Sequence, residues 1–300
     1  MNVLVTGVTG FVGAALVPRL LADGHAVRGF ARDASRVDGD YPVVEGDACT
    51  GAGLHEALRD IDVVYFLLHA MEGEEDFDSA EREMAENVVA AAREQGVPRV
   101  VYLGGLTPQD EDDASPHLAS RHAVERVLLE GFPEGAAFRA SIVIGAGSRS
   151  FDVLADLVER LPVLALPAWR DNRTRPIDVR DVIEYLARAA TLELPVPPRA
   201  FEIGGATELT YGEMVTRIGR LAGHDRPAID LPFDATPLAS RLAAAVTGED
   251  AGLVGPLMES LKHDLVADDA DARERFGVSP RTFDDAVGAA LRERAQPTRT

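Results

Sequence analysis

The chain opens with Met1-Asn2-Val3-Leu4-Val5-Thr6-Gly7-Val8-Thr9-Gly10-Phe11-Val12-Gly13, and this stretch decides the fold. An apolar strand runs into a glycine-rich turn, and the apolar-periodic run 14–22 that follows is typical of a helix. Gly7 permits the tight turn, Gly10 lets a phosphate approach the backbone, and Gly13 lets the helix pack closely on the strand. The free N–H groups at the start of that helix form an anion site suited to a pyrophosphate. The order of strand, turn and helix therefore predicts a nucleotide-binding site.

The motif Thr6-Gly7-x-x-Gly10-x-x-Gly13 resembles the turn of the short-chain dehydrogenase/reductase superfamily, in the form found in its extended and atypical members. The resemblance implies a Rossmann-type fold and an NAD(P) cofactor. The cofactor-binding turn that it implies comprises Thr6, Gly7, Thr9, Gly10, Phe11, Val12 and Gly13.

Beyond this stretch, segments with the pattern of strands alternate with segments with the pattern of helices. We expect strands at 25–31, 41–45, 61–68, 99–103, 137–144, 175–179 and 200–203. We expect helices at 53–59, 77–95, 116–130, 151–160, 181–190, 210–222, 238–246, 253–263, 269–276 and 283–295. This alternation implies right-handed crossovers and an α/β fold with a parallel, doubly wound sheet. We predict a Rossmann-type domain over 1–205, with an insert at 146–175 on the substrate side. A small, mostly helical C-terminal lobe over 206–300 follows, and it is not clearly independent.

The composition excludes several kinds of partner. The chain has 50 acidic and 30 basic residues, a formal charge of −20, and Lys262 is its only lysine. A surface this acidic repels nucleic acid and anionic lipid, so we expect neither as a partner. No apolar run reaches the roughly 20 residues of a membrane span, and the single cysteine, Cys49, fits a reducing cytoplasm. We therefore expect a cytoplasmic protein, and the composition resembles that of halophilic proteins or reflects a GC-rich genome.

The residues after the second strand indicate which dinucleotide is bound. Arg32 stands where an acidic residue would bind the adenosine 2′-hydroxyl of NAD. A positive charge there suits the 2′-phosphate of NADP, and Ser35 and Arg36 are close enough to help, although Asp33 opposes this. We predict NADP in preference to NAD.

The resemblance also assigns residues after the third and fourth strands. It places Asp47 and Ala48 at the adenine, and Leu67 and Leu68 beside the cofactor. It further implies that Asn87, in the following helix, is a polar residue that orders the sheet.

The segment His117-Leu118-Ala119-Ser120-Arg121-His122-Ala123-Val124-Glu125 carries the information on catalysis. Extended short-chain dehydrogenases have Tyr-x-x-Ser-Lys-x-x-x-Glu in this helix. Ser120 and Glu125 keep their places, whereas His117 replaces the tyrosine and Arg121 replaces the lysine. The resemblance implies that His117 is the acid/base, since histidine exchanges protons near neutral pH, and that Arg121 anchors the nicotinamide ribose. His69, at the end of the fourth strand, is a candidate for a second proton donor.

The usual catalytic serine after the fifth strand is missing, because Gly104-Gly105 stands there. An intact nucleotide motif with an altered catalytic set resembles the atypical short-chain dehydrogenases, including NmrA-like proteins and the related accessory subunit of respiratory complex I. From Gly145 on, the chain also resembles sugar-nucleotide epimerases. We predict no metal site.

Two functions stay open. The first is an NADP-dependent oxidoreductase or epimerase-like enzyme with an unidentified small substrate. The second is a non-catalytic dinucleotide-binding protein that acts as a redox sensor or assembly factor through a protein partner, and a homodimer is also compatible with the sequence. The cluster of Arg149, Arg170, Arg173 and Arg175 has two interpretations, since these side chains either meet an anionic substrate or balance carboxylates.

Overall fold

The computed structural model of the protein describes residues 1–69, 77–107, 116–231, 255 and 260–296, with residues 77, 78, 116, 117 and 260 described by their backbone alone. Its centre is a seven-stranded sheet whose neighbouring strands all pair in parallel. In spatial order the strands are β11 (Arg199–Ile203), β6 (Glu134–Ala140), β5 (Arg99–Gly105), β4 (Val63–Phe66), β1 (Asn2–Thr6), β2 (Ala26–Ala31) and β3 (Val43–Glu45). The strand order reverses between β1 and β4, and this switch point is where open α/β sheets bind their ligands.

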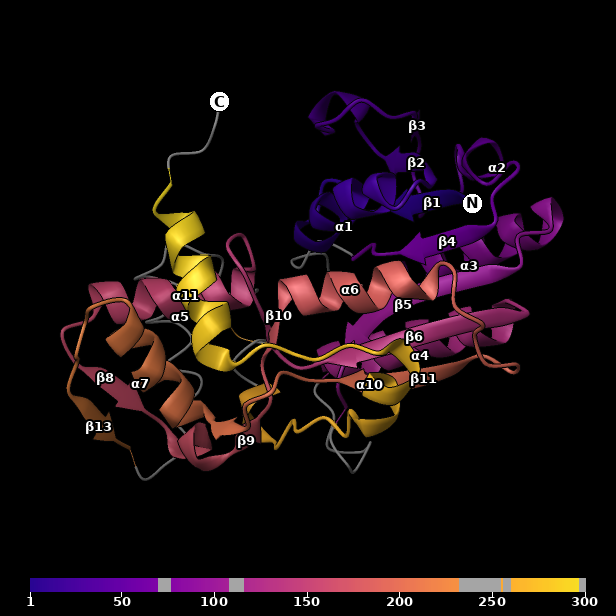
Figure 1. Cartoon of the computed structure of the whole chain (residues 1–300). Helices are drawn as coiled ribbons and strands as arrows, with labels where there is room; N and C mark the ends of the chain where they lie inside the picture. Colours follow the sequence, from indigo (N-terminus) through magenta and orange to yellow (C-terminus); the bar gives the residue numbers. More distant parts are fainter. Residues whose placement is uncertain (70–76, 108–115, 232–254, 256–259, 297–300) are drawn as a thin grey trace.

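Helices cover both faces of the sheet (Figure 1). On one face lie α1 (Phe11–Ala22), α6 (Val179–Ala189) and α10 (Ala270–Phe276). On the other lie α2 (Leu54–Ala57), α3 (Phe77–Gln95) and α4 (Pro116–Gly131). Val3 and Val5 of β1 face the first core and Leu4 faces the second, because side chains alternate along a strand. This arrangement confirms the predicted Rossmann-type, doubly wound α/β fold.

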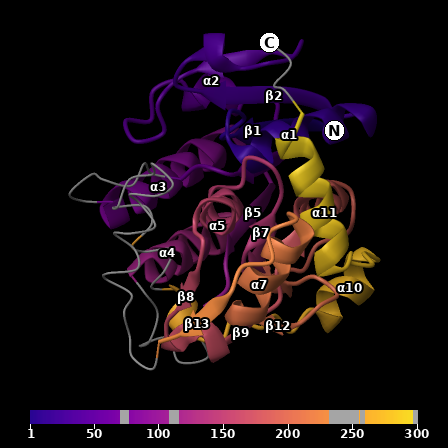
Figure 2. The same ribbon diagram turned by 90° about the vertical axis from the view of Figure 1, so that its left-hand side faces the viewer.

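A third core lies beside the sheet. It is built mainly by α5 (Arg149–Arg160), α7 (Tyr211–Leu221) and α11 (Phe283–Arg294), which lie together in Figures 1 and 2. Three two-stranded sheets join this part: β7 (Val143–Ile144) with β10 (Ile177–Asp178), β9 (Arg173–Thr174) with β12 (Leu209–Thr210), and β8 (Leu164–Leu166) with β13 (Ala228–Asp230). The predicted insert and the predicted C-terminal lobe thus contribute to one core, whereas α10 returns to the central sheet.

The structure differs from the expected elements in a few places. The strand expected at 137–144 is two strands, because the chain leaves the sheet after Ala140 and β7 then pairs with β10. The segment 161–169, in which no element is expected, contains β8 and the start of the 3-10 helix η3 (Ala168–Asp171). Two further 3-10 helices are η1 (Ala34–Arg36) and η4 (Ser260–Lys262). The helix expected at 238–246 and most of that expected at 253–263 lie outside the described residues.

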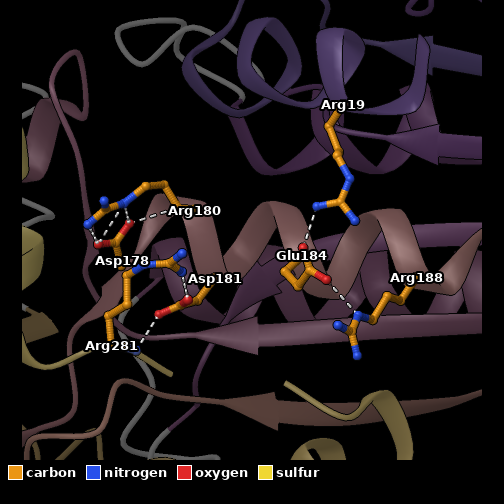
Figure 3. Close-up of polar contacts among 7 residues, drawn as sticks. All are labelled: Arg19, Asp178, Arg180, Asp181, Glu184, Arg188 and Arg281. Atoms are coloured by element: carbon orange, nitrogen blue, oxygen red, sulfur yellow. Dashed lines mark hydrogen bonds and ion pairs between the residues drawn. The ribbon is translucent and has the colours of Figure 1, made fainter. Parts of the chain in front are cut away.

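Acidic side chains on α6 connect helix α1 to the C-terminal part of the chain. Figure 3 shows Glu184 between Arg19 of α1 and Arg188 of α6, with Arg188 Nε 2.7 Å from Glu184 Oε1. Arg188 in turn donates to the carbonyl of Phe276 at 2.6 Å. At the start of the helix, the backbone N–H of Arg281 donates to Asp181 at 2.7 Å. Because residues of α6 bond both to α1 and to the chain at and after the end of α10, helix α6 links these two parts.

Among the described residues, no helix combines the length and the apolar character that a membrane crossing requires.

Candidate active site

The glycine turn after β1 has the geometry that the motif predicts. Gly7 has a φ of +69°, a left-handed conformation that favours glycine. A Cβ on Gly13 would lie 2.2 Å from the carbonyl oxygen of Gly7, so only glycine lets α1 pack this closely. Gly10 caps α1 without a side-chain hydrogen bond, and the first turn of α1 has no acidic residue. The N–H groups that open α1 therefore suit an anion.

A cavity of about 270 Å³ lies between this turn and the carboxyl ends of the central strands. It brings together the glycine turn, the ends of β4 and β5, the start of α4 and the region before α5. Its lining residues are Gly7, Gly10, Phe11, Val12, Gly13, Leu67, His69, Leu103, Gly104, Gly105, Leu118, Arg121, Ala140, Ser141, Val143, Ser148 and Ser150.

The two threonines of the turn do not line this cavity. The Thr6 hydroxyl is buried, donates to the carbonyl of Tyr65 at 3.0 Å and accepts from the N–H of Leu67 at 3.1 Å. It therefore joins β1 to β4 beneath the turn. Thr9 is exposed. Of the two leucines after β4, Leu67 lines the cavity, while Leu68 is half-buried against the core below α3.

The residues predicted to select the dinucleotide lie together after β2. Arg32, Ser35 and Arg36 are all exposed. Asp33 accepts hydrogen bonds from the hydroxyl and the N–H of Ser35, at 2.6 and 3.0 Å, and these bonds hold the pKa of its carboxyl below the usual range. Within the described part of the chain, Arg32 makes no hydrogen bond or ion pair. The Asp33 carboxylate, which would repel a phosphate, is thus hydrogen-bonded to Ser35. The Arg32 guanidinium has no such partner among the described residues.

Asp47 shapes the loop after β3. Its carboxylate accepts from the N–H of Cys49 at 2.9 Å, which closes a turn. The Asn87 side chain of α3 donates to the carbonyls of Ala48 and Cys49, at 2.9 and 2.8 Å. Asn87 thus holds the loop after β3, and its expected role in ordering the sheet stays a prediction.

Arg121 and His69 meet at the lining of the cavity. Nη1 of Arg121 lies 2.9 Å from Nε2 of His69 and also contacts Nδ1. The Arg121 side chain is 13% exposed, and its buried Nε has no hydrogen-bond partner among the described residues. A buried donor without a partner is costly unless a ligand or water satisfies it. Of the three predicted catalytic residues, the structure therefore brings two together. The third, His117, is in the first turn of α4, and its side chain lies outside the described residues.

A buried carboxylate that the sequence analysis missed supports this pair. Glu81 of α3 is 2% exposed and accepts from the Ser120 hydroxyl at 3.2 Å. Its Oε1 lies 3.6 Å from Nη2 of Arg121 and 3.9 Å from Nδ1 of His69. The signal was present, because Glu81 falls on the same helical stripe as the buried Met84, Ala85 and Val88. Its partners Ser120 and Arg121, about 40 residues along the chain, were not evident from sequence.

Glu125, which keeps its family place in α4, is also buried. Its carboxylate pairs with Arg139 of β6, with Arg139 Nε 2.8 Å from Oε2. His122 lies 3.7 Å from the same carboxylate. This second buried cluster does not line the cavity.

Tyr102 does not replace the missing tyrosine. Its phenol is buried, its hydroxyl donates to the carbonyl of Arg121 at 3.3 Å, and burial raises its pKa above the usual range. Such a group is a poor proton donor for a substrate, so it has a structural role. The hydroxyls that line the cavity are those of Ser141, Ser148 and Ser150, which the sequence analysis did not select. Ser141 donates to the carbonyl of Arg175 and Ser148 to that of Val143, at 3.0 and 2.7 Å.

The clustered arginines mainly balance carboxylates. Arg170 lies 3.3 Å from Asp230, and Arg173 lies 2.9 Å from Glu208. Arg175 lies 2.9 Å from Asp269. Arg149, at the start of α5, is exposed.

Comparisons with known proteins agree with the turn and the fold. Residues 7–139 match the family described as NAD(P)H-binding. Over 224 residues the chain is 26% identical to an uncharacterised protein of Mycobacterium tuberculosis, covering 73% of this chain and 23% of that protein. The chain thus spans about a quarter of the length of this relative.

A second relative is similar over more of its length. The 3 beta-hydroxysteroid dehydrogenase/Delta 5-->4-isomerase of M. tuberculosis is 28% identical over 261 residues, which cover 75% of this chain and 70% of that protein. Among solved structures, MoeE5 in complex with UDP-glucose and NAD has a TM-score of 0.73 at 20% identity, covering 97% of this chain and 98% of MoeE5.

The family match and the glycine turn define an NAD(P)H-binding domain, and the solved structures share its fold. These matches support the resemblance to the short-chain dehydrogenase/reductase superfamily. Its extended type is supported by the steroid dehydrogenase relative. The narrower resemblance to NmrA-like proteins and to the complex I accessory subunit stays a prediction.

Proposed function

We propose that the protein is an NAD(P)-dependent oxidoreductase or epimerase-like enzyme that acts on a small substrate in the cavity beside Arg121. One observation carries the proposal. Arg121 and His69, both predicted as catalytic from sequence, converge on the cavity that the glycine turn lines.

The residues of the cavity fit a dinucleotide. The uncapped start of α1 suits the pyrophosphate, and the unpartnered Nε of Arg121 suits a ribose hydroxyl. The bound cofactor would supply the site at which a hydride is accepted or released. Arg121 stays protonated and anchors the ribose, while His69 and His117 exchange protons with the substrate.

The preference for NADP rests on Arg32. Its exposed guanidinium has no carboxylate partner in the described part of the chain, whereas Asp33 is bonded to Ser35. This contrast supports binding of a 2′-phosphate.

The cavity is lined by both polar and apolar side chains. Ser148 and Ser150 line it together with the apolar side chains of Leu103 and Leu118. A secondary alcohol or ketone on an apolar skeleton suits this lining, and the similarity to a hydroxysteroid dehydrogenase supports it.

The proposed function is tested by two measurements on the purified chain. Calorimetric titration with NADP and NADPH is expected to show saturable binding. Incubation with panels of hydroxysteroids, other secondary alcohols and nucleotide sugars is then expected to change the absorbance of the nicotinamide or to yield an epimer. Failure to bind any dinucleotide contradicts the proposal.

One observation favours the non-catalytic alternative, in which the dinucleotide serves sensing or assembly through a protein partner. Gly104-Gly105 stands where the family has its catalytic serine, and the ring of Tyr102 fills the space beside Gly104. Tight dinucleotide binding without turnover of any panel member supports this alternative.

A further inference from the structure

Glu81 is a buried charge next to the cavity but outside its lining. It comes from α3 and faces Arg121, which lines the cavity. Only 2% of its side chain is exposed. A carboxylate this deeply buried is costly unless hydrogen bonds and an opposite charge compensate it.

The surroundings of Glu81 stabilise its ionised form. Oε2 accepts from the Ser120 hydroxyl at 3.2 Å, and Oε1 faces the Arg121 guanidinium at 3.6 Å. The guanidinium of an arginine carries a positive charge. Glu81 and Arg121 therefore form a pair with no net charge, and only its positive member lines the cavity.

We propose that Glu81 is a positioning and charge-compensating residue that sets the relative affinity of the site for the oxidised and reduced dinucleotide. This inference rests on the proposed function, because it assumes that the nicotinamide binds at the Arg121 end of the cavity.

The physical reason is the charge of the ring. The oxidised nicotinamide is a cation and the reduced nicotinamide is neutral, so an uncompensated Arg121 repels the oxidised form alone. The carboxylate of Glu81 cancels this repulsion, and it also holds the guanidinium in place. Between buried charges such effects persist at distances where surface charges are screened.

The chain contains a matched control. Glu125 is equally buried, at 3% exposed, but its partner is Arg139, and neither residue lines the cavity. Loss of this carboxylate tests the general cost of breaking a buried ion pair without changing the charge at the cavity.

The experiment measures the dissociation constants of NADP and NADPH for the wild type and for Glu81→Gln, Arg121→Gln, the double variant and Glu125→Gln. Glu81→Gln is expected to weaken oxidised relative to reduced binding by about tenfold, which is about 30 mV for a two-electron couple. Arg121→Gln is expected to shift the ratio by a similar factor in the opposite direction, although it weakens both forms. The double variant is expected to restore the wild-type ratio, and Glu125→Gln is expected to leave it unchanged.

The direction in which each variant shifts the ratio of NADP to NADPH affinity tests the inference. If Glu81→Gln and Glu125→Gln leave the ratio equally unchanged, Glu81 is only structural and the inference is overturned. If Glu81→Gln does not fold, Arg121→Gln tests the inference alone. The inference is then overturned if this variant does not bind NADP more tightly relative to NADPH than the wild type does. If the wild type binds neither form, the proposed function falls together with this inference, whereas binding with an unshifted ratio removes only the inference.

Discussion

The ring of Tyr102 occupies the space into which a side chain at position 104 would extend. A Cβ on Gly104 would lie 2.7 Å from Cε1 of Tyr102, closer than such contacts occur. The two residues are on the same face of β5, and the Tyr102 hydroxyl is bonded to the carbonyl of Arg121. Tyr102 therefore leaves no room for a side chain at position 104, and it supports the helix of the candidate catalytic residues.

A serine at position 104 is expected to destabilise the protein. Gly104→Ser forces the buried Tyr102 ring to move, and overpacking of this kind costs about 1–3 kcal/mol. Thermal unfolding is expected to show a lower Tm, with no gain of activity.

The double variant Tyr102→Leu/Gly104→Ser is the control. Because leucine leaves room for the new side chain, its Tm is expected to exceed the value obtained by adding the two single effects. Strict additivity contradicts the steric explanation.

Arg32→Ala tests the choice of dinucleotide. Loss of a charged hydrogen-bond donor to the 2′-phosphate is expected to weaken NADP binding by about tenfold or more, with NAD binding nearly unchanged. Titration of both dinucleotides at matched salt measures this. Arg220→Ala, at an exposed position of α7, controls for loss of one positive charge. Equal NAD and NADP binding by the wild type, unchanged in Arg32→Ala, would sink the assignment.

His117→Ala tests the acid/base assignment. If His117 transfers the proton, turnover is expected to fall by about 100-fold or more while the dinucleotide affinity stays nearly intact. Arg121→Ala is expected to weaken the dinucleotide instead.

The matched control is His122→Ala, in the same helix. His122 lies beside Glu125 and Arg139, outside the cavity lining, so its loss is expected to leave turnover largely unchanged. Full activity in His117→Ala would assign this histidine to the helix surface.

Glu184 is expected to contribute to acid stability. Its hydrogen bond from Arg19 holds the pKa of its carboxyl below the usual range, and Arg188 adds to this effect (Figure 3). A lowered folded-state pKa means that the stabilisation is present above the unfolded-state pKa and is lost as the pH falls through the folded-state pKa.

Glu184→Gln is therefore expected to lower the free energy of unfolding at pH 7 by about 1 kcal/mol and to flatten its decline between about pH 5 and 3. Denaturant titrations across this range measure both effects. Glu86→Gln, in the exposed pair with Arg82 on α3, is the control and is expected to change little. A decline with the wild-type slope in Glu184→Gln contradicts the role of this pair.

Much of the fold was predictable because its signals are local. The glycines at 7, 10 and 13 lie within seven consecutive residues, and the backbone around Gly7 and Gly13 leaves no room for a side chain. Short apolar runs likewise indicate the alternation of strands and helices. This alternation predicted the parallel sheet, and the helical pattern predicted both ends of α3. Arg121 and His69 were found through a motif and a strand end, which are also local features.

Tertiary structure alone decided which charges neutralise one another. Ser120 and Arg121, the partners of Glu81 in α4, are about 40 residues away from it. The partners of Arg173 and Arg175 are Glu208 and Asp269. Tertiary structure also determined that the strand expected at 137–144 is divided, since β7 lies outside the central sheet and pairs with β10. The periodicity of a sequence determines which side of a helix is buried, but a buried carboxylate acquires its role only from the side chain that folding brings opposite it.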